Sequence, residues 1–185
     1  MNNRELSEII HSNSLLARYL ISICPADGLP LWIDKRPGYI IVNSDRLGEP
    51  GKHWLLCFLP DQQALVQYFD SYGLAPNSYN DSWKSYFWNW CQNVDGGSAR
   101  VSRNSKPVQD LFSNTCGQHC VSVAHMLLRG FTFDYILNNV YSPTDTCAND
   151  SFAVDYVNSV CKVHLQSRLD EKIVLCARYM HSNIL

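Results

Sequence analysis

The sequence predicts an α+β fold with a small central sheet flanked by helices. Apolar residues recur at helical spacing near the start of the chain and again beyond Gly117, whereas short apolar runs rich in β-branched and aromatic residues lie between them. The 185 residues are 46% hydrophobic and 17% charged, which is typical of a chain that buries a core and not of a disordered one. The length favours a single domain, residues 1–185.

The first half of the chain predicts helices followed by three strands. Residues 4–21 carry apolar side chains at helical intervals and predict one or two helices. Residues 39–43 are a short β-branched run that predicts a strand, and the glycines and proline of residues 44–52 predict a loop. Residues 54–59 and 64–69 are apolar runs separated by Pro-Asp-Gln-Gln, which is the pattern of a hairpin.

The second half is mainly helical. Residues 82–93 predict a helix whose stripe of aromatic side chains is better explained by core packing than by stacking on bases. Residues 94–106 are polar and glycine-rich, which indicates an exposed edge or a loop. Residues 117–129 form a strongly amphipathic pattern with Gly130 placed as a C-terminal cap. Residues 152–160 and 165–179 are also predicted to be helical.

Charge and cysteine usage restrict the class of protein. Fifteen basic and 17 acidic residues give a net charge of −2, which excludes a globally cationic nucleic-acid binder. The longest stretch without charged side chains, residues 111–128, contains several polar residues and is no membrane span. The start lacks an apolar signal core, so we expect an intracellular, non-secreted protein whose eight cysteines are mostly reduced.

One cysteine stands directly in front of a predicted helix. Cys116 precedes Gly117, and the N–H groups and dipole at a helix start favour the thiolate, the nucleophilic form. A thiol nucleophile needs a base, and His53 is a candidate because it leads into the 54–59 strand. Asp70 closes the next strand. If these strands pair, both side chains lie at the same end, where a carboxylate can hold the imidazole in one tautomer.

Four short motifs, in this order, resemble the adenovirus-type cysteine proteases, which are relatives of the SUMO-specific and other ubiquitin-like proteases. The motifs are Gly51-Lys-His53-Trp54, Tyr68-Phe-Asp70-Ser-Tyr-Gly73, Gln109 and Thr115-Cys116-Gly-Gln-His-Cys120. The resemblance spans at least residues 53–129. It implies a papain-like, ubiquitin-like-protease-type fold for the whole domain.

The resemblance also implies catalytic roles. His53 would be the general base, Asp70 would orient it, and Cys116 would be the nucleophile. Gln109 and the backbone N–H of Cys116 would donate hydrogen bonds to the developing oxyanion, which is worth roughly 3 kcal/mol per donor. The chain would therefore be a thiol-dependent cysteine endopeptidase that works without a metal.

The same resemblance implies the substrate. Trp54 and Gly117 would line a narrow site that admits small residues such as Gly, and the substrates would be precursor proteins of a virus or a virus-like element. It further implies a monomer with no membrane contact, located in the host nucleus or the virion if the chain is viral. His119 and Cys120, three and four positions further on, are interpreted as packing or helix-face residues and not as catalytic ones.

Activators are a point of departure. The adenoviral enzyme is activated by a peptide disulfide-linked to a cysteine, and the matching position here is Ser98. That enzyme is also basic and uses DNA, whereas this chain is slightly acidic. The sequence therefore requires no cofactor. An activating peptide, or DNA bound by Lys35-Arg36 or by Arg100, Arg103 and Lys106, stays open as an alternative.

Other readings of the sequence remain. A ubiquitin-like deconjugating protease and a non-enzymatic binding module on the same fold are both compatible with the motifs. A papain-like order of Cys24 and His164 lacks the helix that should follow the cysteine. Ligand-like spacings could instead build a zinc site from Cys116, Cys120, Cys161, His164, Cys176 and His181.

Overall fold

The computed structural model describes residues 1–33, 35–97 and 99–161 of the chain. The expected helix over residues 165–179, Ser98, and the histidines and cysteine of the zinc reading at positions 164, 176 and 181 lie outside these residues. In the described part, no helix is both long enough and apolar enough to cross a bilayer.

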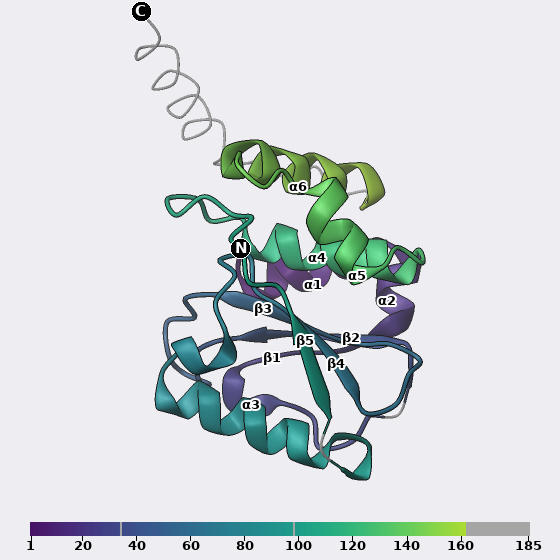
Figure 1. Cartoon of the computed structure of the whole chain (residues 1–185), viewed down its shortest axis with the longest axis vertical. Coiled ribbons are helices and arrows are strands. Elements are labelled where there is room, and N and C mark those ends of the chain that lie inside the picture. The colour runs from purple at the N-terminus through teal and green to yellow at the C-terminus, as the bar shows by residue number, and fades with distance from the viewer. Residues whose placement is uncertain (34, 98, 162–185) are drawn as a thin grey trace, which may run out of the picture.

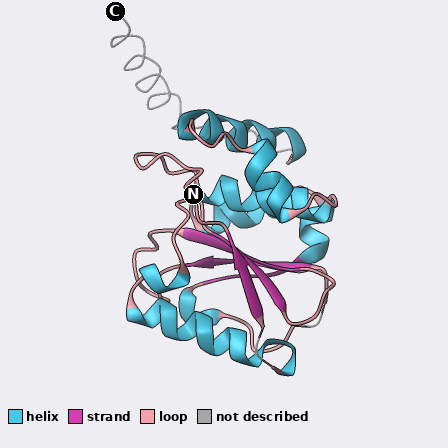
Figure 2. Cartoon of the chain, in the orientation of Figure 1, coloured by secondary structure: helices cyan, strands magenta, loops and turns pink. Residues whose placement is uncertain are grey.

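The elements alternate between helices and short strands (Figures 1 and 2). The first half contains α1 (Asn3–His11), α2 (Ser14–Tyr19), β1 (Leu20–Cys24), η1 (Ala26–Gly28), β2 (Gly38–Asn43), β3 (Trp54–Leu59), β4 (Leu65–Phe69) and η2 (Pro76–Ser78). The second half contains α3 (Asp81–Asn93), η3 (Val94–Gly96), β5 (Arg100–Arg103), α4 (Cys116–Leu128), α5 (Phe133–Tyr135), the π-helical η4 (Ile136–Val140) and α6 (Thr146–Val160).

The sheet has five strands in the order β1-β2-β3-β4-β5. The central β2, β3 and β4 pair antiparallel, whereas the edge strands β1 and β5 pair parallel to their neighbours. The hairpin predicted from residues 54–69 is thus confirmed as β3–β4, with Leu56 opposite Phe69. This register brings the residue before β3 and the residue after β4 to the same end of the sheet.

Helices cover both faces of the sheet (Figure 1). Helix α3 lies on one face, and α1, α2, α4 and α5 lie on the other, with α6 stacked outside α4. The α+β class expected from the sequence is therefore confirmed. Because both faces are covered, β3 is apolar at every position, and its side chains alternate between the two cores. Trp54, Leu56 and Phe58 face α4, while Leu55, Cys57 and Leu59 face α3.

The strand count and the end of the first helical region differ from expectation. The helical region predicted over residues 4–21 ends at Tyr19, because Leu20 and Ile21 belong to β1. Apolar residues at the end of a short helix are compatible with both a helix face and a strand. Here the backbone pairing with β2 places Leu20 and Ile21 in a strand. The expected three-strand centre is wrong, because the sheet has two more strands. One is β1, and the other is β5, a polar edge strand within residues 94–106.

Helix α4 is buried along most of its length. Every residue from Gly117 to Leu127 is buried, because the sheet lies on one side of the helix and α6 on the other. It ends where the sequence predicted, since Gly130 has a φ of +90° and its N–H bonds back to the carbonyl of Leu127. The helix begins at Cys116, so the fold fixes the position of this thiol firmly.

Candidate active site

His53 and Asp70 meet at one end of the β3–β4 hairpin. The Nε2 atom of His53 lies 2.8 Å from Oδ1 of Asp70, and the two side chains are 7% and 0% exposed. The backbone of His53 is fixed, because its carbonyl accepts a hydrogen bond from the N–H of Ser44. Nδ1 is the imidazole nitrogen of His53 that does not bond to Asp70.

Asp70 is a buried carboxylate with several donors. Besides His53, the N–H of Tyr72 donates to Oδ1 at 2.8 Å and the hydroxyl of Tyr79 donates to Oδ2 at 2.6 Å. Its backbone is fixed by Asn104, which accepts from the Asp70 N–H and donates to its carbonyl. These bonds compensate for the loss of water around the charge and fix the orientation of the carboxylate.

Two tyrosines stack on the imidazole of His53. The ring centroid of Tyr72 lies 4.7 Å from that of His53, and that of Tyr79 lies 6.2 Å away, with interplanar angles of 23° and 13°. An aromatic face attracts a cation. The surroundings of His53 therefore combine an oriented carboxylate with aromatic faces, and both favour the imidazolium.

His53 and Cys116 each shift the pKa of the other. Burial raises the pKa of the Cys116 thiol, but the hydrogen bond and positive charge of His53, with a backbone hydrogen bond from Trp54, outweigh burial and bring the pKa below its usual value. Burial lowers the pKa of His53, whereas Asp70 and Cys116 raise it to about 9. Both directions favour a thiolate–imidazolium pair.

The other cysteines behave differently. Burial raises the pKa of each of a group of thiols in the described part of the chain, namely Cys24, Cys57, Cys91, Cys120 and Cys161. Cys120 is fully buried, and its Sγ donates to the carbonyl of Trp54 at 3.4 Å. Cys24 lies in a strand and not before a helix. Cys116 is thus chemically distinct from these thiols.

Gln109 lies close to the same centre but is fully hydrogen-bonded. Its Oε1 accepts from Ser71 at 2.6 Å, and its Nε2 donates to the carbonyl of Ser113 at 3.1 Å and to the hydroxyl of Tyr72 at 3.2 Å. The side chain is therefore fixed in orientation.

The first residue of the chain lies beside the thiol. The indole Nε1 of Trp54 donates to the carbonyl of Met1 at 3.0 Å, and a Cβ on Gly117 would lie 2.7 Å from the sulfur of Met1. A side chain at Gly117 would have to displace the flexible side chain of Met1. A cavity of about 370 Å³ adjoins this cluster, lined by Met1, Asn2, Asn3, Glu5, Asn43, Pro50, Gly51 and Trp54.

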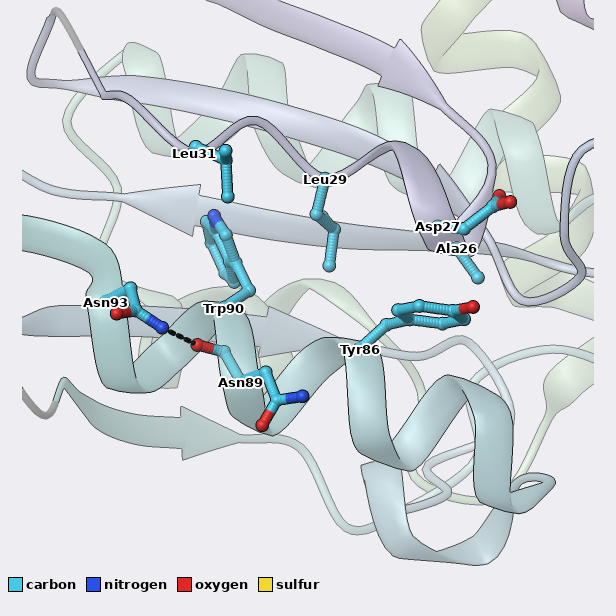
Figure 3. Close-up of a pocket in the computed structure, with 8 residues that line it drawn as sticks. All are labelled: Ala26, Asp27, Leu29, Leu31, Tyr86, Asn89, Trp90 and Asn93. Atoms are coloured by element: carbon cyan, nitrogen blue, oxygen red, sulfur yellow. Dashed lines mark hydrogen bonds between the residues drawn. The ribbon is translucent and has the colours of Figure 1, made fainter.

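A second cavity, of about 170 Å³, lies between α3 and the segment that follows β1 (Figure 3). Its lining consists of Ala26, Asp27, Leu29, Leu31, Tyr86, Asn89, Trp90 and Asn93. The side chains are mostly apolar or amides and include no thiol or imidazole. None of the residues predicted from the motifs lines this cavity.

The structure brings together His53, Asp70, Cys116, Gln109 and Trp54 from separate elements. Sequence reasoning missed a set of residues around them, namely Met1, Ser71, Tyr72, Tyr79 and Asn104. Tyr72 belongs to a motif that was noted, and its place beside Asp70 was a usable signal. Asn104 and Tyr79 approach Asp70 only through the fold.

A viral protein is similar to this chain in sequence. No family model matches the chain. It is 28% identical over 138 residues to R355 of Acanthamoeba polyphaga mimivirus, a protein named as a thiol protease, and the match covers 71% of this chain and 45% of that one. The chain thus spans less than half the length of this relative.

Two solved structures share a partial likeness. ChlaDub1 of Chlamydia trachomatis gives a TM-score of 0.45 at 15% identity, over 85% of this chain and 75% of that one. The ASFV pS273R protease gives a TM-score of 0.42 at 16% identity, over 64% of this chain and 43% of that one.

Proposed function

We propose that the chain is a cysteine endopeptidase that cleaves precursor proteins after small residues such as Gly. The observation that carries the proposal is a buried His53 that is hydrogen-bonded to Asp70 and coupled to Cys116, so that the pKa of the thiol is lowered and that of the imidazole is raised. Such a pair supplies a nucleophile and a proton donor in one site. The sequence similarity to a viral protein named as a thiol protease supports it.

Acylation begins with attack of the Cys116 thiolate on the scissile carbonyl carbon. A carbon–sulfur bond forms, and the carbonyl electron pair moves to oxygen. The backbone N–H of Cys116 and Nε2 of Gln109 are the proposed donors to this oxygen. The imidazolium of His53 then gives its proton to the leaving amine, the carbon–nitrogen bond breaks, and a thioester remains on Cys116.

Deacylation uses the same residues in reverse roles. Neutral His53 takes a proton from a water molecule, which attacks the thioester carbon. The carbon–sulfur bond breaks, the acid product leaves, and the thiolate–imidazolium pair is restored. Throughout, Asp70 keeps Nε2 protonated, so that the other ring nitrogen handles the transferred proton.

The walls of the site support a preference for small residues. Trp54 is nearly buried and hydrogen-bonded to Met1, so its indole is fixed, and Met1 fills the space beside Gly117. Little room remains next to the thiol for a branched substrate side chain. Protein substrates of viral or element-encoded origin are the expected partners, with no obligatory cofactor.

A peptidase assay tests the proposal. Wild-type protein should cleave peptides with Gly before the scissile bond faster than matched peptides with Val, and a peptide electrophile ending in Gly-Gly should modify Cys116. Cys120→Ala serves as the matched thiol control and should still be labelled. No cleavage of any Gly-containing substrate, together with no labelling of Cys116, would refute the endopeptidase. Cleavage only after a folded ubiquitin-like domain would favour the deconjugating alternative.

A further inference from the structure

A buried carboxylate on the outer helix contacts the segment between the proposed oxyanion donor and the nucleophile. Asp150 of α6 is 4% exposed. Its Oδ2 accepts from the N–H of Asp110 at 3.2 Å, and its Oδ1 accepts from the hydroxyl of Thr115 at 2.7 Å. Asp110 directly follows Gln109, and Thr115 directly precedes Cys116. One side chain therefore fastens both ends of the 110–115 loop.

The contact with Thr115 changes what this residue does for α4. Thr115 occupies the N-cap position, where a threonine hydroxyl usually accepts from the first-turn N–H groups. Here its side chain makes no such capping bond and donates to Asp150 instead. The first turn of α4 therefore keeps backbone donors for groups other than the cap, at the end of the helix that carries Cys116.

A buried histidine completes the arrangement. His119 is fully buried one turn into α4, with Nε2 2.8 Å from Oδ1 of Asp150 and Nδ1 3.1 Å from the hydroxyl of Tyr141. Ser122 lies 3.1 Å from the same hydroxyl. His119 is buried, as a packing residue should be, and it is also part of a polar network. A network of this kind in the interior fixes one relative placement of its elements.

We propose that Asp150 is a positioning residue, which sets the distance between Gln109 and Cys116 by holding both ends of the loop that joins them. The inference rests on the proposed function, because it assigns the loop to the site that receives the oxyanion. Asp150 touches neither substrate nor thiol in this arrangement. Its effect passes through Thr115 and Asp110, while His119 and Tyr141 fix Asp150 itself.

This role predicts a separation between two reactions of the same thiol. Alkylation by iodoacetamide needs the thiolate but forms no oxyanion. Peptide hydrolysis needs both. Loss of the Asp150–Thr115 bond should therefore leave the rate of Cys116 alkylation and its pH profile within about twofold of wild type, while kcat for peptide hydrolysis falls by at least about tenfold with little change in KM.

The test compares Thr115→Val with Thr115→Ser. Val keeps the shape of Thr without the hydroxyl, whereas Ser keeps the hydroxyl and should restore most of kcat. Thr132→Val is the matched control, because its hydroxyl caps α5 and does not contact Asp150. Full kcat in Thr115→Val would overturn the proposal. So would an equal loss of alkylation and hydrolysis, since that pattern is expected of a misfolded protein.

Hydrogen exchange gives a readout that needs no activity. The amides of residues 109–116 should exchange at least about tenfold faster in Thr115→Val than in wild type or Thr115→Ser, because a hydrogen bond to a carboxylate is lost. Unchanged exchange would overturn the positioning role even in an inactive protein. If Thr115→Val shows this faster exchange but the wild-type protein never cleaves a peptide, the result counts against the proposed function and not against the positioning role of Asp150.

Discussion

The hydroxyl of Tyr79 donates a 2.6 Å hydrogen bond to Oδ2 of Asp70, the oxygen opposite to the one that faces His53. The carboxylate is thus held from both sides. Because Tyr79 lies after the β4 turn and next to η2, this contact connects the loop over residues 71–79 to the orientation of the imidazole.

Removal of this hydroxyl should slow turnover without unfolding the protein. In Tyr79→Phe the ring remains beside His53, but Oδ2 of Asp70 loses a buried donor, so we expect kcat to fall by about tenfold. Steady-state kinetics of Tyr79→Phe and Tyr86→Phe should be compared, since Tyr86 lies on α3 beneath Arg46 and has no contact with Asp70 among its described interactions. Wild-type kcat in Tyr79→Phe would contradict the expected role.

The two cysteines of the α4 N-terminal turn should respond in opposite ways. Cys116→Ala should abolish peptidase activity and leave the melting temperature nearly unchanged, because the thiol serves chemistry. Cys120→Ala should remain active but lose about 1 kcal/mol of stability, because its buried thiol bonds to the carbonyl of Trp54. Activity assays and thermal melts of both variants check this, and residual full activity in Cys116→Ala would exclude Cys116 as the nucleophile.

His53 and Asp70 should contribute unequally. His53→Ala leaves no base beside Cys116 and should lose nearly all turnover. Asp70→Asn should retain more, because Tyr72 and Tyr79 still stack on the imidazole and keep part of its orientation. The relevant measurement is kcat/KM for both variants at equal folded fraction. Wild-type rates in both would show that the pair is not catalytic.

Activity should follow a bell-shaped pH profile. Below the lowered pKa of Cys116 the thiol is neutral, so activity rises as pH increases through that value. Above a pH of about 9 the imidazolium of His53 loses its proton, so activity falls again. The rate of iodoacetamide modification against pH, with Cys116→Ala as the blank, reports the acidic limb. In His53→Ala this limb should move to higher pH, and an unmoved limb would disprove the coupling.

DNA should have little effect on turnover. The basic residues near β5, namely Arg100, Arg103 and Lys106, are exposed, but the net charge of the chain is −2. Each phosphate contact contributes about −0.9 to the slope of log binding constant against log salt concentration, so few contacts give weak binding. We expect duplex DNA to change kcat/KM less than about twofold at low salt. Strong stimulation that declines steeply with salt, and is lost in Arg100→Ala with Arg103→Ala, would establish DNA as an activator.

Local patterns were sufficient to predict the elements that bury side chains on a regular period. The β3–β4 hairpin, α3 and α4 all have such patterns, and the hairpin also predicted that the ends of its strands lie together. The edge strands were harder. In β1, Leu20 and Ile21 continue a helical period, and in β5 only Val101 is even partly buried, so backbone pairing alone defines that strand.

The surroundings of the site could not be predicted from spacing. Asn104 reaches Asp70 across 34 positions, Asp150 reaches Thr115 across 35, and Met1 reaches Trp54 across 53. Each contact depends on how the loops and α6 settle on the sheet. For His119, an amphipathic helix predicted burial correctly but gave no indication of the carboxylate that pairs with it.

The proposed catalytic pair joins the sheet to the helical layer that packs on it, since His53 precedes β3 and Cys116 begins α4. His53 is fixed by contacts within the sheet and Cys116 by its place in α4. The distance between the imidazole and the thiol therefore depends on how α4 packs on the sheet. A slip of α4 along β3 by about 1 Å would cost about a hundredfold in rate while breaking few bonds in either layer. The proposed activity would then be lost through a small shift between the two layers, at conditions under which the protein is still folded.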